Sequence, residues 1–206
     1  MSIFKPIFLF IVLAFQSCIY NKVTHLSDED LEWIDTYDVG DTILFVSNHG
    51  NTDIMIIAEK FLYNEKYPFY ISEGSGSNYE ANMGYDYIIR HNGINIDGAI
   101  LFRKNIADSL ELIFDFGKRF LRFDNNNICG PLQISQYQHN NKLYYFCIVA
   151  DTVNSGYSDY WVNKIKNKVV KFVWSKEHGL IYYKFEDGEE FFREDLLPDS
   201  VDNTTN

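Results

Sequence analysis

The C-terminal part of the chain limits the fold most, because very short links join its apolar segments. Segments 168–175, 180–185 and 189–193 are rich in Val, Phe, Ile and Tyr, which favour β-strands. Only a few residues separate them, with Gly179 and Gly188 at the turns. A parallel pairing needs a crossover of roughly a dozen or more residues, so these segments are predicted to form an antiparallel meander.

Strand-like segments also fill most of the remaining chain, separated by turns rich in Gly, Asn and Asp. We expect about eleven to thirteen strands. The predicted fold class is mainly β, with an antiparallel sheet that forms an open barrel (lipocalin-like or LolA-like) or a sandwich and one short N-terminal helix. The strands expected outside the meander are 42–47, 52–57 (with a continuation to 63 as an alternative), 85–90, 94–96, 99–102, 109–114, 118–123, 132–137 and 142–149.

Three predictions concern turns and loops. If residues 49–50 form a two-residue turn, Phe45 faces Ile54 across the first hairpin. Asp97-Gly98 is expected to be another turn, which ends one strand and begins the next. Residues 73–84 and 151–159 are polar and are expected to be loops.

The segment that starts at Ser27 has the signature of a helix N-terminus. Ser27 is suited to cap a helix of residues 28–35, with Asp30 at the third helical position. The chain has 206 residues, which suggests one domain, and we place that domain at 27–197. The polar tail 198–206 is predicted to be disordered.

The first 17 residues are predicted to be a signal peptide that is removed. They contain one cation, Lys5, and an apolar run that is shorter than the ~20 residues of a membrane-spanning helix. Phe15-Gln16-Ser17-Cys18 resembles a bacterial lipobox, and this resemblance implies that Cys18 carries lipid (palmitate among its acyl chains) and becomes the new N-terminus. Residues 18–26 are then a lipidated tether. The alternative is a plain secretory peptide followed by an unrelated cysteine.

Two further stretches carry a family resemblance. YDVGDTILFVSNHGNTDIMIIAEK (37–60) and VWSKEHGLIYYKFEDGEEFFRE (173–194) resemble the opening and closing segments of uncharacterised Bacteroidota-type cell-envelope lipoproteins. The resemblance implies a lipid-anchored protein of a bacterial envelope, with the outer membrane as the expected site. It transfers no catalytic residue.

The charge of the chain excludes one class of partner. The formal net charge is −11, so phosphate backbones repel the protein and we expect no nucleic-acid partner. Anionic membrane surfaces are disfavoured for the same reason, and the predicted membrane contact is made through the N-terminal lipid.

The residues that commonly carry chemistry show no catalytic or metal-binding spacing. The five histidines, 25, 49, 91, 139 and 178, are expected in surface turns or in the tether, and none has the paired spacing of metal ligands. Residues 74–77 are interpreted as a flexible loop and not a phosphate-binding one. We therefore predict no catalytic residue, no metal and no cofactor.

Cys129 and Cys147 are a candidate disulfide, since an oxidising compartment permits one. The expected hairpin places Cys147 opposite Ile134, and Cys129 is then about 16 Å away along the strand. A bridge needs Cα atoms within about 7 Å, so Gly130-Pro131 would have to fold the chain back. The alternative is two buried thiols.

Two hypotheses of function follow. The first is an envelope lipoprotein without enzymatic activity, which binds a small molecule, a glycan or a protein through its many aromatic residues. The second is an envelope hydrolase that uses paired carboxylates or a metal in a cleft.

Overall fold

The structure is a computed structural model that describes residues 22–65, 79–116, 119–123, 134–151, 156–157 and 167–197, the segments 119–123 and 156–157 by their backbone alone. The predicted signal peptide, Cys18, Cys129, the loop 74–77 and the tail 198–206 lie outside these residues.

The described chain forms one twelve-stranded sheet with the strand order β7-β8-β10-β11-β12-β1-β2-β3-β4-β5-β6-β9. Neighbouring strands pair antiparallel throughout, and the sheet is open, with β7 and β9 at its two ends. This confirms the predicted mainly β, antiparallel fold. The strands are β1 Thr42–Ser47, β2 Thr52–Tyr63, β3 Asn82–His91, β4 Ile94–Lys104, β5 Leu110–Phe116, β6 Arg119–Phe123, β7 Ile134–His139, β8 Lys142–Asp151, β9 Gly156–Tyr157, β10 Val169–Ser175, β11 Gly179–Phe185 and β12 Glu190–Arg193.

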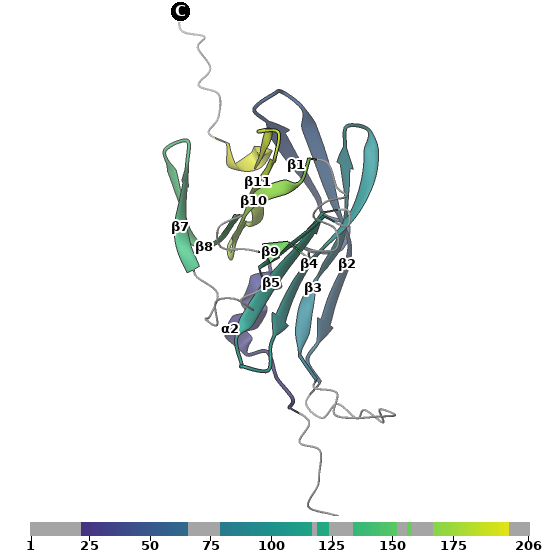
Figure 1. Ribbon diagram of the computed structural model, residues 1–206, viewed down its shortest axis with the longest axis vertical. Coiled ribbons are helices and arrows are strands. Elements are labelled where there is room, and N and C mark those ends of the chain that lie inside the picture. The colour runs from purple at the N-terminus through teal and green to yellow at the C-terminus, as the bar shows by residue number, and fades with distance from the viewer. Residues whose placement is uncertain are drawn as a thin grey trace, which may run out of the picture.

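The sheet curls around its core, so that strands distant in the order face each other (Figure 1). The ring of Phe114 on β5 lies 4.7 Å from that of Phe172 on β10, and Phe102 on β4 lies 5.8 Å from Trp174 on β10. Aromatic pairs at such separations add to the stabilisation from burial alone. The core is therefore the concave interior of the sheet. A second, smaller cluster lies on the opposite face of β8 and β10–β12, where the 3₁₀ helix η3 (Glu194–Leu196) contributes Leu196.

The first hairpin differs from its prediction by one residue. Phe45 pairs with Asp53 and Leu44 with Ile54, so the loop has three residues, 48–50, in place of two. The Ser47 hydroxyl accepts hydrogen bonds from the backbone of His49 and Asn51, which stabilises the longer loop. Because side chains alternate between faces, this shift turns Asp53 into the core and Ile54 away from it.

The expected turn at Asp97-Gly98 is wrong, because β4 continues through it from Ile94 to Lys104. Gly98 pairs with Tyr87 on β3, and the tyrosine ring occupies the space that a side chain at Gly98 would need. A Cβ atom there would lie 2.4 Å from the ring. The glycine is thus required by close packing inside a strand and not by a turn.

Two expected loops contain strand residues. Residues 82–84 belong to β3, and 156–157 form β9, which pairs with β6. Residues 22–26, the described part of the expected tether, also differ from the prediction. Val23 forms a bridge with Tyr79, and Thr24 and Leu26 are buried, so the folded domain begins before residue 27.

The predicted helix is present as one turn of α-helix, α2 (Asp28–Leu31), followed by the 3₁₀ helix η1 (Glu32–Ile34). Ser27 caps it as predicted, and its backbone N–H donates to the Asp30 carboxylate in a capping box. In Figure 1 this segment lies in the opening of the curled sheet.

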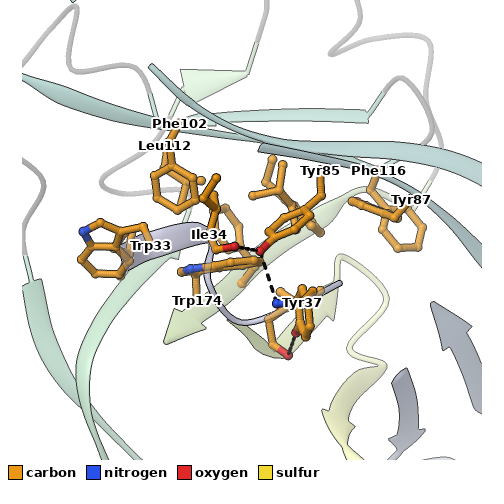
Figure 2. Packing of buried hydrophobic residues seen from close by; sticks show 14 of the residues in the cluster. Trp33, Ile34, Tyr37, Tyr85, Tyr87, Phe102, Leu112, Phe116 and Trp174 are labelled. Atoms are coloured by element: carbon orange, nitrogen blue, oxygen red, sulfur yellow. Dashed lines mark hydrogen bonds between the residues drawn. The ribbon is translucent and has the colours of Figure 1, made fainter. Parts of the chain in front are cut away.

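One hydroxyl fastens that segment to the sheet. Tyr85 on β3 is fully buried, and its hydroxyl donates to the carbonyl oxygen of Ile34 and accepts from the backbone N–H of Tyr37, as Figure 2 shows. Trp33 stacks on Phe102 in the same core. Burial raises the pKa of Tyr85, so the group is neutral and keeps its donor proton.

Tyr85→Phe should lower the free energy of unfolding by about 1–3 kcal/mol, because it leaves a buried carbonyl and a buried N–H without their partner. Tyr63→Phe is the matched control, since Tyr63 is exposed and should change stability little. Urea denaturation followed by circular dichroism measures both. Equal stability of the two variants would contradict the role assigned to Tyr85.

Candidate functional site

Large side chains of the described residues fill the concave interior of the sheet. The largest side chains with essentially no exposed surface are Trp174, Tyr85, Tyr87, Tyr183, Phe45, Phe102, Phe114, Phe116, Phe172, Phe185, Phe191 and Met55. They share one cluster.

A buried polar network lies at the rim of this core, near the loop 48–50. The carboxylate of Asp53 has no exposed surface; it lies 2.9 Å from His91 Nδ1 and accepts a 2.5 Å hydrogen bond from the hydroxyl of Tyr183. The network joins β2, β3 and β11. Sequence reasoning missed it, because it expected His91 in a surface turn and paired Phe45 with Ile54 in place of Asp53.

The contacts of His91 fit one tautomer of its ring. With the hydrogen on Nδ1, the ring donates to the Asp53 carboxylate, and Nε2 can accept from the amide nitrogen of Asn92, which lies 3.1 Å away. Burial, followed by the charge of Asp53, raises the pKa of Tyr183 well above its usual value. Asp53 therefore accepts two hydrogen bonds, which is what a buried carboxylate requires.

This geometry resembles one half of a catalytic triad, in which an aspartate orients a histidine through Nδ1. In such sites Nε2 faces a serine or cysteine nucleophile. Here, among the described residues, the group within hydrogen-bond distance of Nε2 is the side-chain amide of Asn92. Rings of Phe185 and Phe191 pack within 5.0 and 5.7 Å of the imidazole. The arrangement is better explained as a structural hydrogen-bond network that joins strands across the core than as a catalytic site.

The outer face of β2–β5 carries a hollow of about 650 Å³ that we name the acidic hollow. Ala58, Gly98 and Ala99 line it with small or absent side chains. Its other lining residues are Asp86, Tyr87, Ile88, Asn95, Ile96, Asp97 and Asp115. The curvature of the sheet and the small residues together leave room for a guest group.

Strand register fixes the spacing of the three aspartates. Asp86 and Asp115 pair with the two sides of Ala99, so their Cα atoms lie about 10 Å apart, twice the strand spacing. Asp97 precedes Ala99 by two residues and is a diagonal neighbour of both, at about 7–8 Å. Asp86 and Asp97 are exposed, and Asp115 is half-buried. Three carboxylates thus surround a floor of small residues.

Apolar side chains continue from the hollow onto β1 and β2. Leu44 and Ile56 are exposed, and Ile54 and Ile88 are half-buried on the same face. Cross-strand pairs Leu44–Ile54 and Ile56–Ile88 make them contiguous, and we name these four residues the apolar strip. The outer face therefore combines negative charge with an apolar surface.

The predicted site residues are placed as follows. Cys147 is buried and has no disulfide partner among the described residues, and burial raises the pKa of its thiol to about 11. It pairs with Ser135 and not Ile134, because the exposed Phe146, at φ 49°, adds a bulge to β8. Its candidate partner Cys129 lies outside the described residues, so the disulfide stays a prediction, as does the lipid on Cys18.

The histidines differ from their expected surface positions in three cases. His25 and His49 are exposed as expected, whereas His91, His139 and His178 are partly buried. His139 stacks on Phe192 at 3.9 Å, and burial lowers the pKa of both His139 and His178. Among the described residues, no three His, Cys, Asp or Glu side chains are placed to hold a metal ion.

Comparisons with known protein families, with curated proteins and with solved structures return no match. The resemblance to envelope lipoproteins therefore stays a prediction. The helices within the described residues are all too short or too polar to cross a bilayer.

Asp53→Ala should destabilise the protein by about 3–5 kcal/mol, because it leaves the buried Tyr183 hydroxyl and His91 Nδ1 unpaired. Glu59→Ala, an exposed acid further along β2, should stay within about 0.5 kcal/mol of wild type. Urea midpoints at pH 7 provide the measurement. A loss at Asp53 no larger than the loss at Glu59 would show that the network does not stabilise the core.

Proposed function

We propose that the protein is a lipid-anchored component of the cell envelope that binds a basic partner segment on the outer face of β1–β5. The lipid on Cys18 supplies attachment, and the sheet supplies recognition. The observation that carries the binding role is the acidic hollow next to the apolar strip.

Charge complementarity selects the class of partner. Three carboxylates around one hollow attract a cation, and the floor of alanine and glycine leaves space for a lysine or arginine side chain. The neighbouring apolar strip offers contact to aliphatic groups of the same segment. An extended peptide with alternating basic and apolar side chains matches both features, because its side chains repeat with the same period as those of the sheet.

The overall charge supports the same choice. A net charge of −11 disfavours anionic ligands, including nucleic acid and phosphate-rich glycolipid headgroups. It favours encounter with positively charged proteins, at a rate that falls as salt rises.

The hydrolase hypothesis is less well supported by the same residues. Their spacing overlaps the range used by glycosidases, but a general acid requires a carboxyl group removed from water. Asp86 and Asp97 lie exposed on an open sheet face, so only Asp115 of the three is partly removed from water. Exposed carboxylates around a hollow are better suited to binding a cation than to general acid catalysis.

Titration with tetralysine, followed by backbone amide shifts in NMR, tests the binding role. We expect shifts centred on residues 86–88 and 97–99 that weaken at high salt, and none with tetraglutamate. Asp86→Asn/Asp97→Asn should weaken binding about fivefold, as expected for the loss of two exposed charge pairs.

Asp38→Asn/Glu65→Gln is the matched control, because it removes the same charge from exposed positions outside the hollow. Its affinity should stay close to wild type. Equal weakening in both double variants would mean that net charge alone attracts the peptide, and the site assignment would fail.

A further inference from the structure

We propose that the end of the domain bearing Val23, Leu62 and Tyr63 rests against the surface of the lipid bilayer. This inference rests on the proposed anchor at Cys18 and adds an orientation to it. The residues that carry it come from the start of the described chain and from the end of β2.

The start of the chain is firmly attached to this end of the sheet. Val23 forms a bridge with Tyr79, and the backbone N–H of Thr24 donates to the Tyr79 carbonyl at 3.0 Å. The side chain of Asn64 then binds the backbone of Leu26 twice, at 2.9 and 3.0 Å. These contacts fix the point at which the chain leaves the domain toward Cys18.

The distance from that point to the lipid is short. Lys22 comes four positions after Cys18 in sequence, and four Cα-to-Cα steps span at most about 14 Å when the chain is fully extended. If Cys18 carries the acyl chains, this end of the sheet cannot lie farther than that from the headgroups. No comparable limit applies to the rest of the domain.

The side chains at this end suit such a boundary. Three large apolar or aromatic side chains are exposed at this end of the domain. Leu62 is 51% exposed, Tyr63 is 55% exposed and Val23 is 39% exposed. The ring of Phe61 lies 5.9 Å from that of Tyr63, so an aromatic pair ends β2. Tyrosine is enriched where a membrane meets water, because its ring is apolar and its hydroxyl is polar.

The occupant is a bilayer and not a second copy of the chain, because the tether brings a bilayer to this end in every orientation it allows. A second copy would meet the same short tether and the same headgroups. The contact therefore needs no further partner.

The opposite end of the sheet provides a matched control position. Asn82 pairs with Tyr63 at one end of β3 and His91 pairs with Ile94 at the other, about 30 Å away along the strand. Ile94 is 66% exposed, which makes it comparable with Leu62 in size and exposure. The two positions differ chiefly in their predicted distance from the membrane.

Leu62→Trp and Ile94→Trp, each in the full acylated protein, test the orientation. Each variant is reconstituted into phosphatidylcholine vesicles, with or without bromine atoms on the acyl chains near the headgroups. The emission of the wild-type protein, which contains three tryptophans, is measured in the same vesicles and subtracted from that of each variant. We expect brominated lipid to quench most of the emission from position 62 and to leave that from position 94 unchanged.

Flotation of the vesicles separates the two proposals. Protein that floats with vesicles but shows no quenching at position 62, or equal quenching at both positions, overturns the orientation and leaves the anchor intact. Protein that does not float overturns the anchor and, with it, this inference. A shift of the emission at position 62 that depends on protein concentration and not on bromine would instead identify a second copy as the occupant.

Discussion

A buried carboxylate sets the register on which both faces of the sheet depend. Asp53 can enter the core only because Tyr183 and His91 donate to it there. A buried charge without such partners costs several kcal/mol, so the network favours one pairing of β1 with β2 over its neighbours. A slip by one residue would expose Asp53 and turn Ile54 and Ile56 inward, which exchanges the two faces of β2.

The same register produces the outer surface that we interpret as functional. With Asp53 and Met55 inward, Ile54 and Ile56 must face outward, beside the acidic hollow. Gly98 acts on the inner face, where its missing side chain lets the buried Tyr87 ring lie against the strand. If β2 ends at the membrane, as proposed, its strand axis leads away from the bilayer. The outer face then points sideways into the aqueous space, where a partner segment has access.

Much of the fold could be predicted from the sequence because local signals determined it. The capping box of Ser27, the short links of the C-terminal meander and most strand positions rest on nearby residues alone. The turn at 92–93, with φ values of 50° and 77°, is equally local, because Asn and Gly tolerate that conformation.

The candidate sites depend on partners that are distant in sequence, and local patterns did not reveal them. Asp-Gly at 97–98 is a common turn signal, and only the Tyr87 ring from the neighbouring strand explains why the strand continues there. Likewise, the local sequence fits the expected two-residue loop 49–50 as well as the observed three-residue loop 48–50. Tyr183, which is 130 residues from Asp53, is one of the partners that favour the longer loop.

The most direct test of this account is the pairing of β1 with β2 in solution, measured by nuclear Overhauser effects between backbone protons. The account predicts cross-strand contacts of Phe45 with Asp53 and of Leu44 with Ile54. Contacts of Phe45 with Ile54 would place Asp53 on the outside and would contradict the buried network, the apolar strip and the functional surface built on it.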